Sequence, residues 1–503
     1  MKTAVSIIAA IMLCMPAFAD NDHDISSPVT ETSGMPEAGS ADKAKKEKKK
    51  VTYDENGEII KTGINLGPLP VVAFDADRGF QFGALLNLYN FGDGKNYPNP
   101  NAQWYFEASA YMKESRVGSY LLRAEYDNKT LIPGVRMSVC TGYYKDQALD
   151  FYGFNGYQSV YDMASLKDNI EFADSKGGKK LQEKYDKSVE KGGLKLPKGF
   201  YRFGRELVRI KADFTGKITN NFYWEAGYHF NWIRTNSFKP TDYTVYGNDI
   251  DGGTSLFSLY KDWGIIPEKD ADGGVISSLR AGLMYDSRNV ENNPTKGIWA
   301  EAHFIAAPKF LGTSHQHFKF NATMRQYIPL GTPKLVFAYR LAYQGFLGDA
   351  PWYAMPVYTT MGPKPDYDGI GGYRTVRGVM LNRVQGLHTG FYNIELRYRF
   401  VDFKLFNQNI AFALSGFTDA AHVFKGYDLT NRNEAALAIS APVKNELYKK
   451  YVDTSRNDGF HGSAGAGLRF IMNHNFIVAF EYARCFNKQD GDGAFYINIG
   501  FLF

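Results

Sequence analysis

The stretch YNIELRYRF, residues 392–400, alternates strictly between two kinds of side chain. Its even-numbered residues are apolar or aromatic, and its odd-numbered residues are polar, with charges at Glu395, Arg397 and Arg399. Successive side chains of a β-strand point to opposite faces, so this stretch predicts a strand with one apolar and one charged face. A soluble β-sandwich could expose the charged face to water. In a transmembrane barrel the charged face would line the lumen and the apolar face would meet lipid.

The same period of two residues recurs from about Leu69 to the end of the chain. Residues 79–90 and 102–112 repeat it, with apolar side chains on one face and mostly polar side chains on the other. About sixteen strands can be placed in this way, which lies within the even-numbered range of bacterial barrels. They are expected at residues 69–76, 79–90, 102–114, 117–127, 133–143, 200–214, 221–235, 276–288, 297–307, 315–328, 334–346, 387–400, 409–424, 460–471, 475–487 and 493–503.

The lengths of the expected connections separate the sandwich from the barrel. Counted from the first hairpin, the even-numbered connections are short, as at residues 217–221 and 329–333. The long insertions all fall in odd-numbered connections: 144–198, 238–274, 347–384 and 425–459. Long extracellular loops at one end and short turns at the other are typical of an outer-membrane barrel. The sequence therefore predicts an all-β fold, a closed transmembrane antiparallel barrel without the open sheet edges that a bilayer cannot accommodate.

The composition excludes several other classes of protein. The chain has 503 residues and a mean hydropathy of −0.35, whereas a polytopic helical membrane protein needs about 20 consecutive apolar residues for each span. Its 50 glycines, 20 prolines and 15% aromatic residues fit a chain of strands and turns. Three cysteines exclude a disulfide framework and a cysteine-based metal cluster. The net charge of +5 forms no concentrated basic stripe, so no nucleic-acid partner is expected.

The N-terminus has the pattern of an export signal. Met1-Lys2 precedes a short apolar run at residues 4–15, and Ala17-Phe18-Ala19 matches the cleavage pattern, so residues 1–19 are expected to be removed. The run is too short for an uncleaved membrane anchor. Residues 20–65 are predicted to form a disordered, charged periplasmic tether, because an acidic block is followed by a lysine-rich one. Residues 66–503 would then form the barrel in the outer membrane of a Gram-negative bacterium.

The C-terminal residues continue the alternation to the final carboxylate. A soluble domain seldom ends on an apolar strand with a terminal aromatic residue, because chain ends fray. We therefore expect these residues to act as an assembly signal and to close the cylinder against the first strand. The alternating apolar positions are Phe495, Ile497, Ile499, Phe501 and Phe503.

The most informative motif is GGYRTVRGV at residues 371–379, in the sixth expected long-side loop. It is followed by Asn393-x-Glu395-x-Arg397 on one strand and by Phe417-x-Asp419 on the next. In this order and spacing, the sequence resembles the bacterial surface antigen superfamily, the outer-membrane barrels of the BamA/TamA type. The resemblance covers residues from about 66 to 503.

The resemblance implies that the sixth loop folds back into the barrel with Val376, Arg377 and Gly378 at its tip. Arg377 would then pair with the lumen carboxylates of Glu395 and Asp419, which a forked guanidinium can hold better than a lysine can. On loop charge alone, Arg377 would be one of many exposed loop cations.

Two features depart from the family pattern. Members that insert or export proteins carry POTRA domains before the barrel, whereas residues 20–65 have no apolar pattern for a folded domain. The tip also has Val379 where the family usually has an aromatic residue. The expected protein is a relative that lacks POTRA domains.

The resemblance implies a role in assembling or transporting outer-membrane proteins or other envelope components. In this role, the barrel would open laterally at a seam between residues 70–74 and 495–503. The expected partners are outer-membrane lipid and other assembly factors or client proteins. A passive channel or a surface-exposed structural protein is the alternative. No enzyme activity, catalytic residue, metal or cofactor is expected, since the histidines lack a nucleophile motif and His315-x-His317 lacks an evident third ligand.

Overall fold

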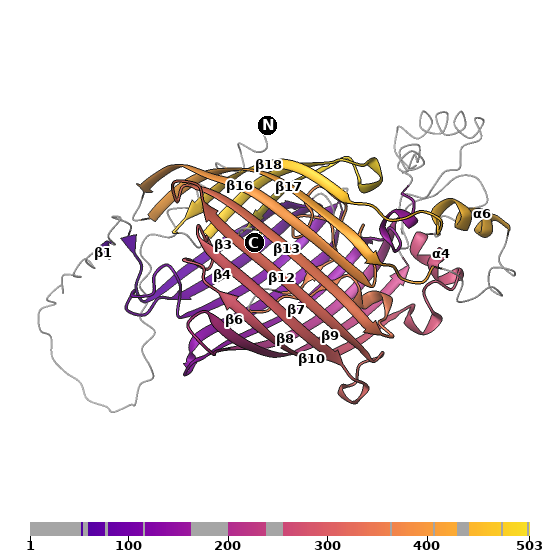
Figure 1. The fold of residues 1–503 in the computed structure, drawn as a ribbon, viewed down its shortest axis with the longest axis horizontal. Helices are drawn as coiled ribbons and strands as arrows, with labels where there is room; N and C mark the ends of the chain where they lie inside the picture. The colour runs from indigo at the N-terminus through magenta and orange to yellow at the C-terminus, as the bar shows by residue number, and fades with distance from the viewer. Residues whose placement is uncertain are drawn as a thin grey trace, which may run out of the picture.

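A computed structural model of the chain shows the fold (Figure 1). It describes residues 52–503 apart from 54–58, 76–78, 114–115, 162–199, 238–254, 363–364, 406–407, 430–441, 474–475 and 500–501. The predicted signal peptide and most of the predicted tether lie outside these residues.

Sixteen antiparallel strands form one closed barrel in which each strand pairs with the next along the chain and the last pairs with the first. Around the barrel, the strands are β3 (Ile64–Asp75), β4 (Gly79–Asn90), β5 (Ala102–Lys113), β6 (Arg116–Ile132), β7 (Val135–Asp150), β8 (Arg202–Lys217), β9 (Phe222–Ser237), β10 (Gly273–Asp286), β11 (Gly297–Ala307), β12 (His317–Pro329), β13 (Leu335–Gly348), β16 (His388–Leu405), β17 (Gln408–Lys425), β18 (His461–Met472), β19 (Phe476–Cys485) and β20 (Ala494–Ile499). The predicted barrel and its strand number are confirmed.

The smaller elements lie before the first barrel strand or in the connections between barrel strands. They are β1 (Thr52–Tyr53), β2 (Ile59–Ile60), β14 (Val357–Tyr358), β15 (Tyr367–Asp368), the helices α4 (Leu256–Asp262) and α6 (Pro442–Tyr451), and 3₁₀ turns at Gly156–Gln158, Glu268–Asp270, Lys309–Leu311, Trp352–Ala354 and Lys488–Asp490. Neither α4 nor α6, nor any other helix among the described residues, has the length and apolar character needed to cross a bilayer.

Along the barrel wall, successive side chains alternate between the lumen and the outer surface, as predicted. On β16, Asn393 and Glu395 are fully buried toward the lumen, whereas Leu396 and Tyr398 are 45% and 48% exposed on the outside. The same arrangement places a charged inner surface opposite an apolar outer one, as a lipid-embedded barrel requires.

Several strand ends differ from the prediction. β3 begins earlier, at Ile64, while β6, β7 and β16 continue to Ile132, Asp150 and Leu405. β20 ends at Ile499 instead of running to Phe503. The backbone carbonyl of Phe503 accepts a hydrogen bond of 3.1 Å from Arg397, and its ring packs near Tyr327 inside the barrel. The expectation of an alternating strand to the last residue is wrong at this end, because lumen arginines hold the terminal residue away from the ladder.

The last residues of the predicted tether are ordered against the barrel. Ile59 is buried, its N–H donates to the side chain of Asn409 over 3.1 Å, and Asn409 returns a hydrogen bond of 3.2 Å to the Ile59 carbonyl. β3 then begins at Ile64. The chain is therefore fixed to the barrel slightly before the predicted boundary at residue 66.

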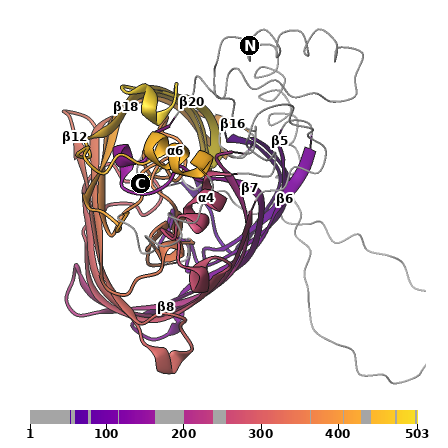
Figure 2. The same ribbon diagram turned by 90° about the vertical axis from the view of Figure 1, so that its right-hand side faces the viewer.

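A cluster of aromatic residues covers the long-loop end of the barrel. Phe151 packs edge-on against Phe257 of α4 and against Trp352, with ring centroids 5.5 and 6.2 Å away, and Trp352 donates a hydrogen bond of 2.8 Å to the carbonyl of Asp270. Figure 2 shows α4 and α6 lying across this mouth of the barrel. Aromatic rings bury large apolar areas, so this cap joins several loops into one packed unit.

At the short-turn end, Glu291 ties the turn after β10 to strands β6 and β7. Its carboxylate lies 2.6 Å from Lys129 Nζ and 3.3 Å from Arg136 Nη2. Burial alone would raise the pKa of Glu291, but the charges of Arg136 and Lys129 outweigh burial and hold its pKa at about 2.

This ion pair predicts an acid-sensitive contribution to stability. A depressed carboxyl pKa stabilises the fold above the unfolded-state value and loses that contribution as pH falls, here from about 5 toward about 2. Because the carboxylate is 30% exposed, the contribution is discounted to about 1 kcal/mol. Heat-modifiable electrophoretic mobility, measured across pH, should show this loss in the wild type. In Glu291→Gln the difference from wild type should be present at neutral pH and disappear in acid; a constant difference would contradict the assignment.

Candidate functional site

The loop of residues 349–387, between β13 and β16, enters the lumen and turns back on itself at a tip formed by residues 371–380. Gly371 has φ +114°, and a Cβ there would lie 1.9 Å from the Met380 carbonyl oxygen, so only glycine fits. Thr375 closes the tip, because its hydroxyl accepts from the Gly371 N–H and donates to the Gly371 carbonyl over 2.9 and 2.8 Å. The tip is thus a compact hairpin inside the barrel.

Arg377 projects from the tip into a pocket of carboxylates. Its Nε and Nη2 donate to the two oxygens of Asp419 over 2.8 and 2.9 Å, and its Nη1 pairs with Glu395 and, over 2.8 Å, with Glu481. Its guanidinium carbon lies 3.4 Å from the ring centre of Phe417. The structure therefore brings Arg377, Glu395 and Asp419 together, all fully buried.

Three further residues complete this network, and sequence reasoning missed them as site residues. Arg469 donates to Glu481 over 2.8 Å and to Glu395 over 3.1 Å, while Arg397 donates to the other oxygen of Glu395 over 2.6 Å. Three arginines thus face three carboxylates, which balances the buried charge. The alternation places Glu481 and Arg469 on inward faces, but no local pattern shows that they meet Arg377.

The residues beside Arg377 seat the tip against the last strands. Val376 is fully buried and packs with Phe391 of β16. The Gly378 N–H donates to the Tyr496 hydroxyl of β20 over 3.1 Å, and a Cβ at Gly378 would lie 2.9 Å from that of Ala483. The tip therefore touches β20 directly, beside the closure of the barrel.

A second buried network holds the same loop further along. Asp366 lies 3.2 Å from Arg280, 3.3 Å from His229 and 3.8 Å from Lys211, all on the wall of β8–β10. Asp368 pairs over 3.2 and 3.0 Å with two arginines of β8. Sequence reasoning missed this network because neither aspartate belongs to a recognised motif.

The predicted C-terminal signal residues do not share one environment. Phe495 is 37% exposed on the outside, whereas Ile497 is buried among apolar residues such as Val478 and Ile410. Ile499 ends β20, Phe501 lies outside the described residues, and Phe503 is buried in the lumen.

The closure between β20 and β3, here called the seam, has the shortest ladder in the barrel. Among the described residues, which leave out 76–78 and 500–501, a single pair, Ile497 opposite Phe74, joins β20 to β3, whereas β3 is paired with β4 along its full length. Pro68 and Pro70 of β3 lack the N–H that a ladder needs, which suits an edge strand. A cavity of about 270 Å³ lies beside the seam, lined in part by Asn498 of β20.

The two histidines considered as a metal pair have separate partners. His315 lies between two aspartates, with Nε2 2.5 Å from Asp270 and Nδ1 3.1 Å from Asp349, and so links three extracellular loops. The Nδ1 of His317 lies 2.8 Å from the His315 carbonyl oxygen. The hydrogen bond from His315 lowers the pKa of Asp349, whereas burial raises the pKa of Asp270.

Solved structures and a family model are similar to this chain. BamA from Haemophilus ducreyi lacking POTRA domains 1–3 is 13% identical, with a TM-score of 0.46, over 89% of this chain and 73% of that one. CdiB from Escherichia coli is 10% identical, with a TM-score of 0.50, over 87% of this chain and 62% of that one, so this chain spans less than two thirds of CdiB. No curated protein matches. Residues 196–503 match the Omp85 superfamily domain, more than half of the chain. The chain therefore belongs to the Omp85 superfamily, whose barrels lie in the outer membrane of Gram-negative bacteria.

Proposed function

We propose that this barrel assists the assembly or transport of outer-membrane proteins or other envelope components, and that its seam is where a client engages. The observation that carries this proposal is that, in the part of the chain that the structure describes, a single pair joins β20 to β3. Omp85 barrels are assembly and transport proteins, which fits such a role. Residues 1–19, in this proposal, are a cleaved export signal, and the charged segment that follows is a periplasmic tether.

The seam is the part of the ladder that separates at least cost. Its ladder is limited to one pair within the described residues, and local opening follows the least protected segments of a structure. Opening would expose the edge of β3, and a strand edge with free backbone groups can pair with an incoming extended segment. The cavity beside β20 offers space on the lumen side for such a segment.

A passive channel, the alternative function, has less support. The loop tip with Arg377 fills part of the lumen, the aromatic cap around Trp352 covers one mouth, and the Glu291 ion pairs tie the turns at the other. Purified protein in planar bilayers should therefore show a mostly closed state. A large and steady conductance would favour the channel.

The proposed role is tested by locking the seam with a disulfide. In a background without Cys140 and Cys485, the pair Phe74→Cys and Ile497→Cys faces across the seam. Oxidation should lower the abundance of other folded outer-membrane proteins as far as depletion of this protein does, and a reductant should restore them, because a locked seam cannot admit a client.

The matched control joins β4 to β5 through Leu86→Cys and Phe106→Cys, which are opposed in a complete ladder. Oxidation of this control should change nothing. Normal levels of outer-membrane proteins after depletion or after complete seam locking would refute the proposed role.

A further inference from the structure

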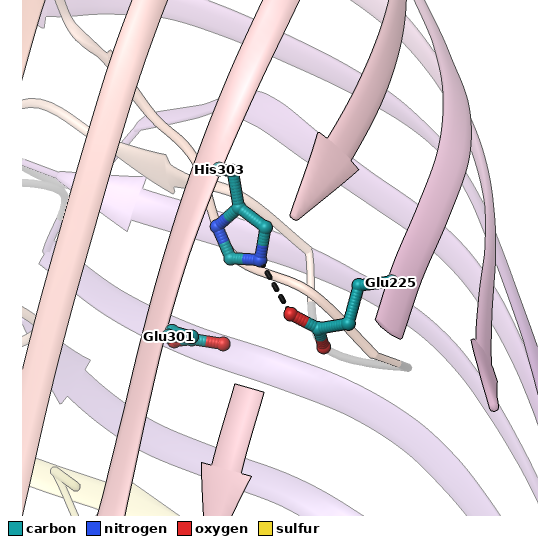
Figure 3. Close-up of side chains that lie close together, drawn as sticks. All are labelled: Glu225, Glu301 and His303. Carbon is teal, nitrogen blue, oxygen red and sulfur yellow. Dashed lines mark hydrogen bonds and ion pairs between the residues drawn. The ribbon is translucent and has the colours of Figure 1, made fainter. Parts of the chain in front are cut away.

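Three buried side chains meet on the inner wall of the barrel, half-way around from the seam. They are Glu225 of β9 and Glu301 and His303 of β11, shown in Figure 3. The intervening strand β10 places Gly282 opposite both Glu225 and His303. A Cβ at this glycine would lie 2.3 Å from the His303 ring, so its absence lets His303 Nε2 approach Glu225 Oε2 to 2.6 Å.

This cluster contains polar atoms that the described residues leave unsatisfied. The exposed fractions of Glu225, Glu301 and His303 are 3%, 5% and 1%. Glu301 Oε2 is buried and has no hydrogen-bond partner among the described residues, and the same holds for both amide atoms of Asn321, which stands opposite His303 on β12. An unpaired carboxylate oxygen away from water is costly, which indicates that a ligand is missing here.

We propose that Glu225, Glu301 and His303 bind one divalent transition-metal ion, with Zn²⁺ as its representative. One ligand atom from each residue lies within 4.8 Å of the others. Zinc bonds of about 2.0–2.2 Å to nitrogen and oxygen place neighbouring ligands roughly 3.4 Å apart in a tetrahedron. For such a geometry, the histidine and Glu225 would separate slightly and Glu301 would move inward. An imidazole beside two carboxylates favours such an ion over Mg²⁺ or Ca²⁺.

The neighbouring arginine is compatible with this site. Arg325 donates to Glu301 Oε1 over 2.9 Å and stacks on Trp299 at 3.8 Å, which leaves Glu301 Oε2 available. Two carboxylates and one guanidinium give the immediate cluster a net negative charge when the imidazole is neutral, which attracts a divalent cation. The arginine should nevertheless weaken binding, because it competes electrostatically for Glu301. A bound ion would tie β9 to β11 across β10 and stiffen the wall opposite the seam.

The test is equilibrium dialysis of the full-length protein, folded in detergent and stripped with a chelator, against Zn²⁺. We expect one zinc per chain that depends on the cluster. Glu225→Gln and His303→Gln should each weaken binding on the order of 100-fold or more, since loss of even an outer-shell partner costs 10–100-fold. Arg325→Gln should tighten binding. The matched control Glu206→Gln removes a strand carboxylate that pairs with Lys145 outside the cluster, and it should bind as the wild type does.

Two results would overturn the proposal. One is the absence of zinc binding to folded wild-type protein, and the other is binding that is unchanged in folded Glu225→Gln and His303→Gln, which would place the ion elsewhere. Heat-modifiable mobility identifies variants that fail to fold. In that event the wild type alone decides, because Co²⁺ bound by this ligand set should give the intense visible absorption of a low-coordinate site, and its absence would also overturn the proposal.

Discussion

Replacing Arg377 by alanine should lower the stability of the folded barrel by about 3–5 kcal/mol, the usual cost of breaking a buried ion pair by removing one partner. Asp419 and Glu395 are fully buried, and Asp419 would lose both hydrogen bonds from the guanidinium of Arg377 and keep only the one from the backbone N–H of residue 377. The heat-modifiable band of the variant should convert to the unfolded form at a lower temperature than that of the wild type.

One further variant separates the effect of charge from that of geometry at this site, and a second variant is a control elsewhere. Arg377→Lys keeps the charge but cannot fork to two carboxylates, so it should recover only part of the lost stability. Arg484→Ala removes an exposed arginine of β19 and should leave the transition unchanged. A wild-type transition in Arg377→Ala would show that the tip does not hold the barrel together.

The barrel could be predicted from the sequence because the alternation of apolar and polar side chains is visible within each strand. Each strand separates lipid from lumen, so the period of two survives in any short stretch, as in residues 392–400. The contact of Arg377 with Glu395 and Asp419 joins a loop to the barrel wall. No local pattern predicts such a contact, and it was expected only because the sequence resembles a known family.

Other features depend on distant contacts that no local pattern reports. Phe503 leaves the alternation because Arg397, far away in sequence, binds its carbonyl. Glu225 meets His303 only because Gly282 stands between them without a side chain. In each case the deciding neighbour is set by the register of the closed sheet, which the sequence alone does not fix.

The second large effect is expected at Asp366, which anchors the middle of the same loop. Asp366→Asn would leave Arg280 without its carboxylate partner at 3.2 Å and would remove the negative charge that faces Lys211 and His229. All three wall groups are at least nine-tenths buried, so their charge cannot be screened by water. The cost should be about 3 kcal/mol, at the lower end for a broken buried pair because Asp213 still faces Lys211 and His229.

Asp366→Asn should release a different part of the loop from the part that Arg377→Ala releases. The tip would keep its own carboxylates, while the stretch near Asp366 would detach from the wall of β8–β10, so bilayer recordings should show more frequent opening. Asp93→Asn is the matched control, since Asp93 pairs with Lys95 at an exposed turn, where such a pair contributes little. If Asp366→Asn has the stability and closed state of the control, then Asp366 does not hold the loop, and Arg377 together with the two arginines that pair with Asp368 would have to keep the lumen plugged.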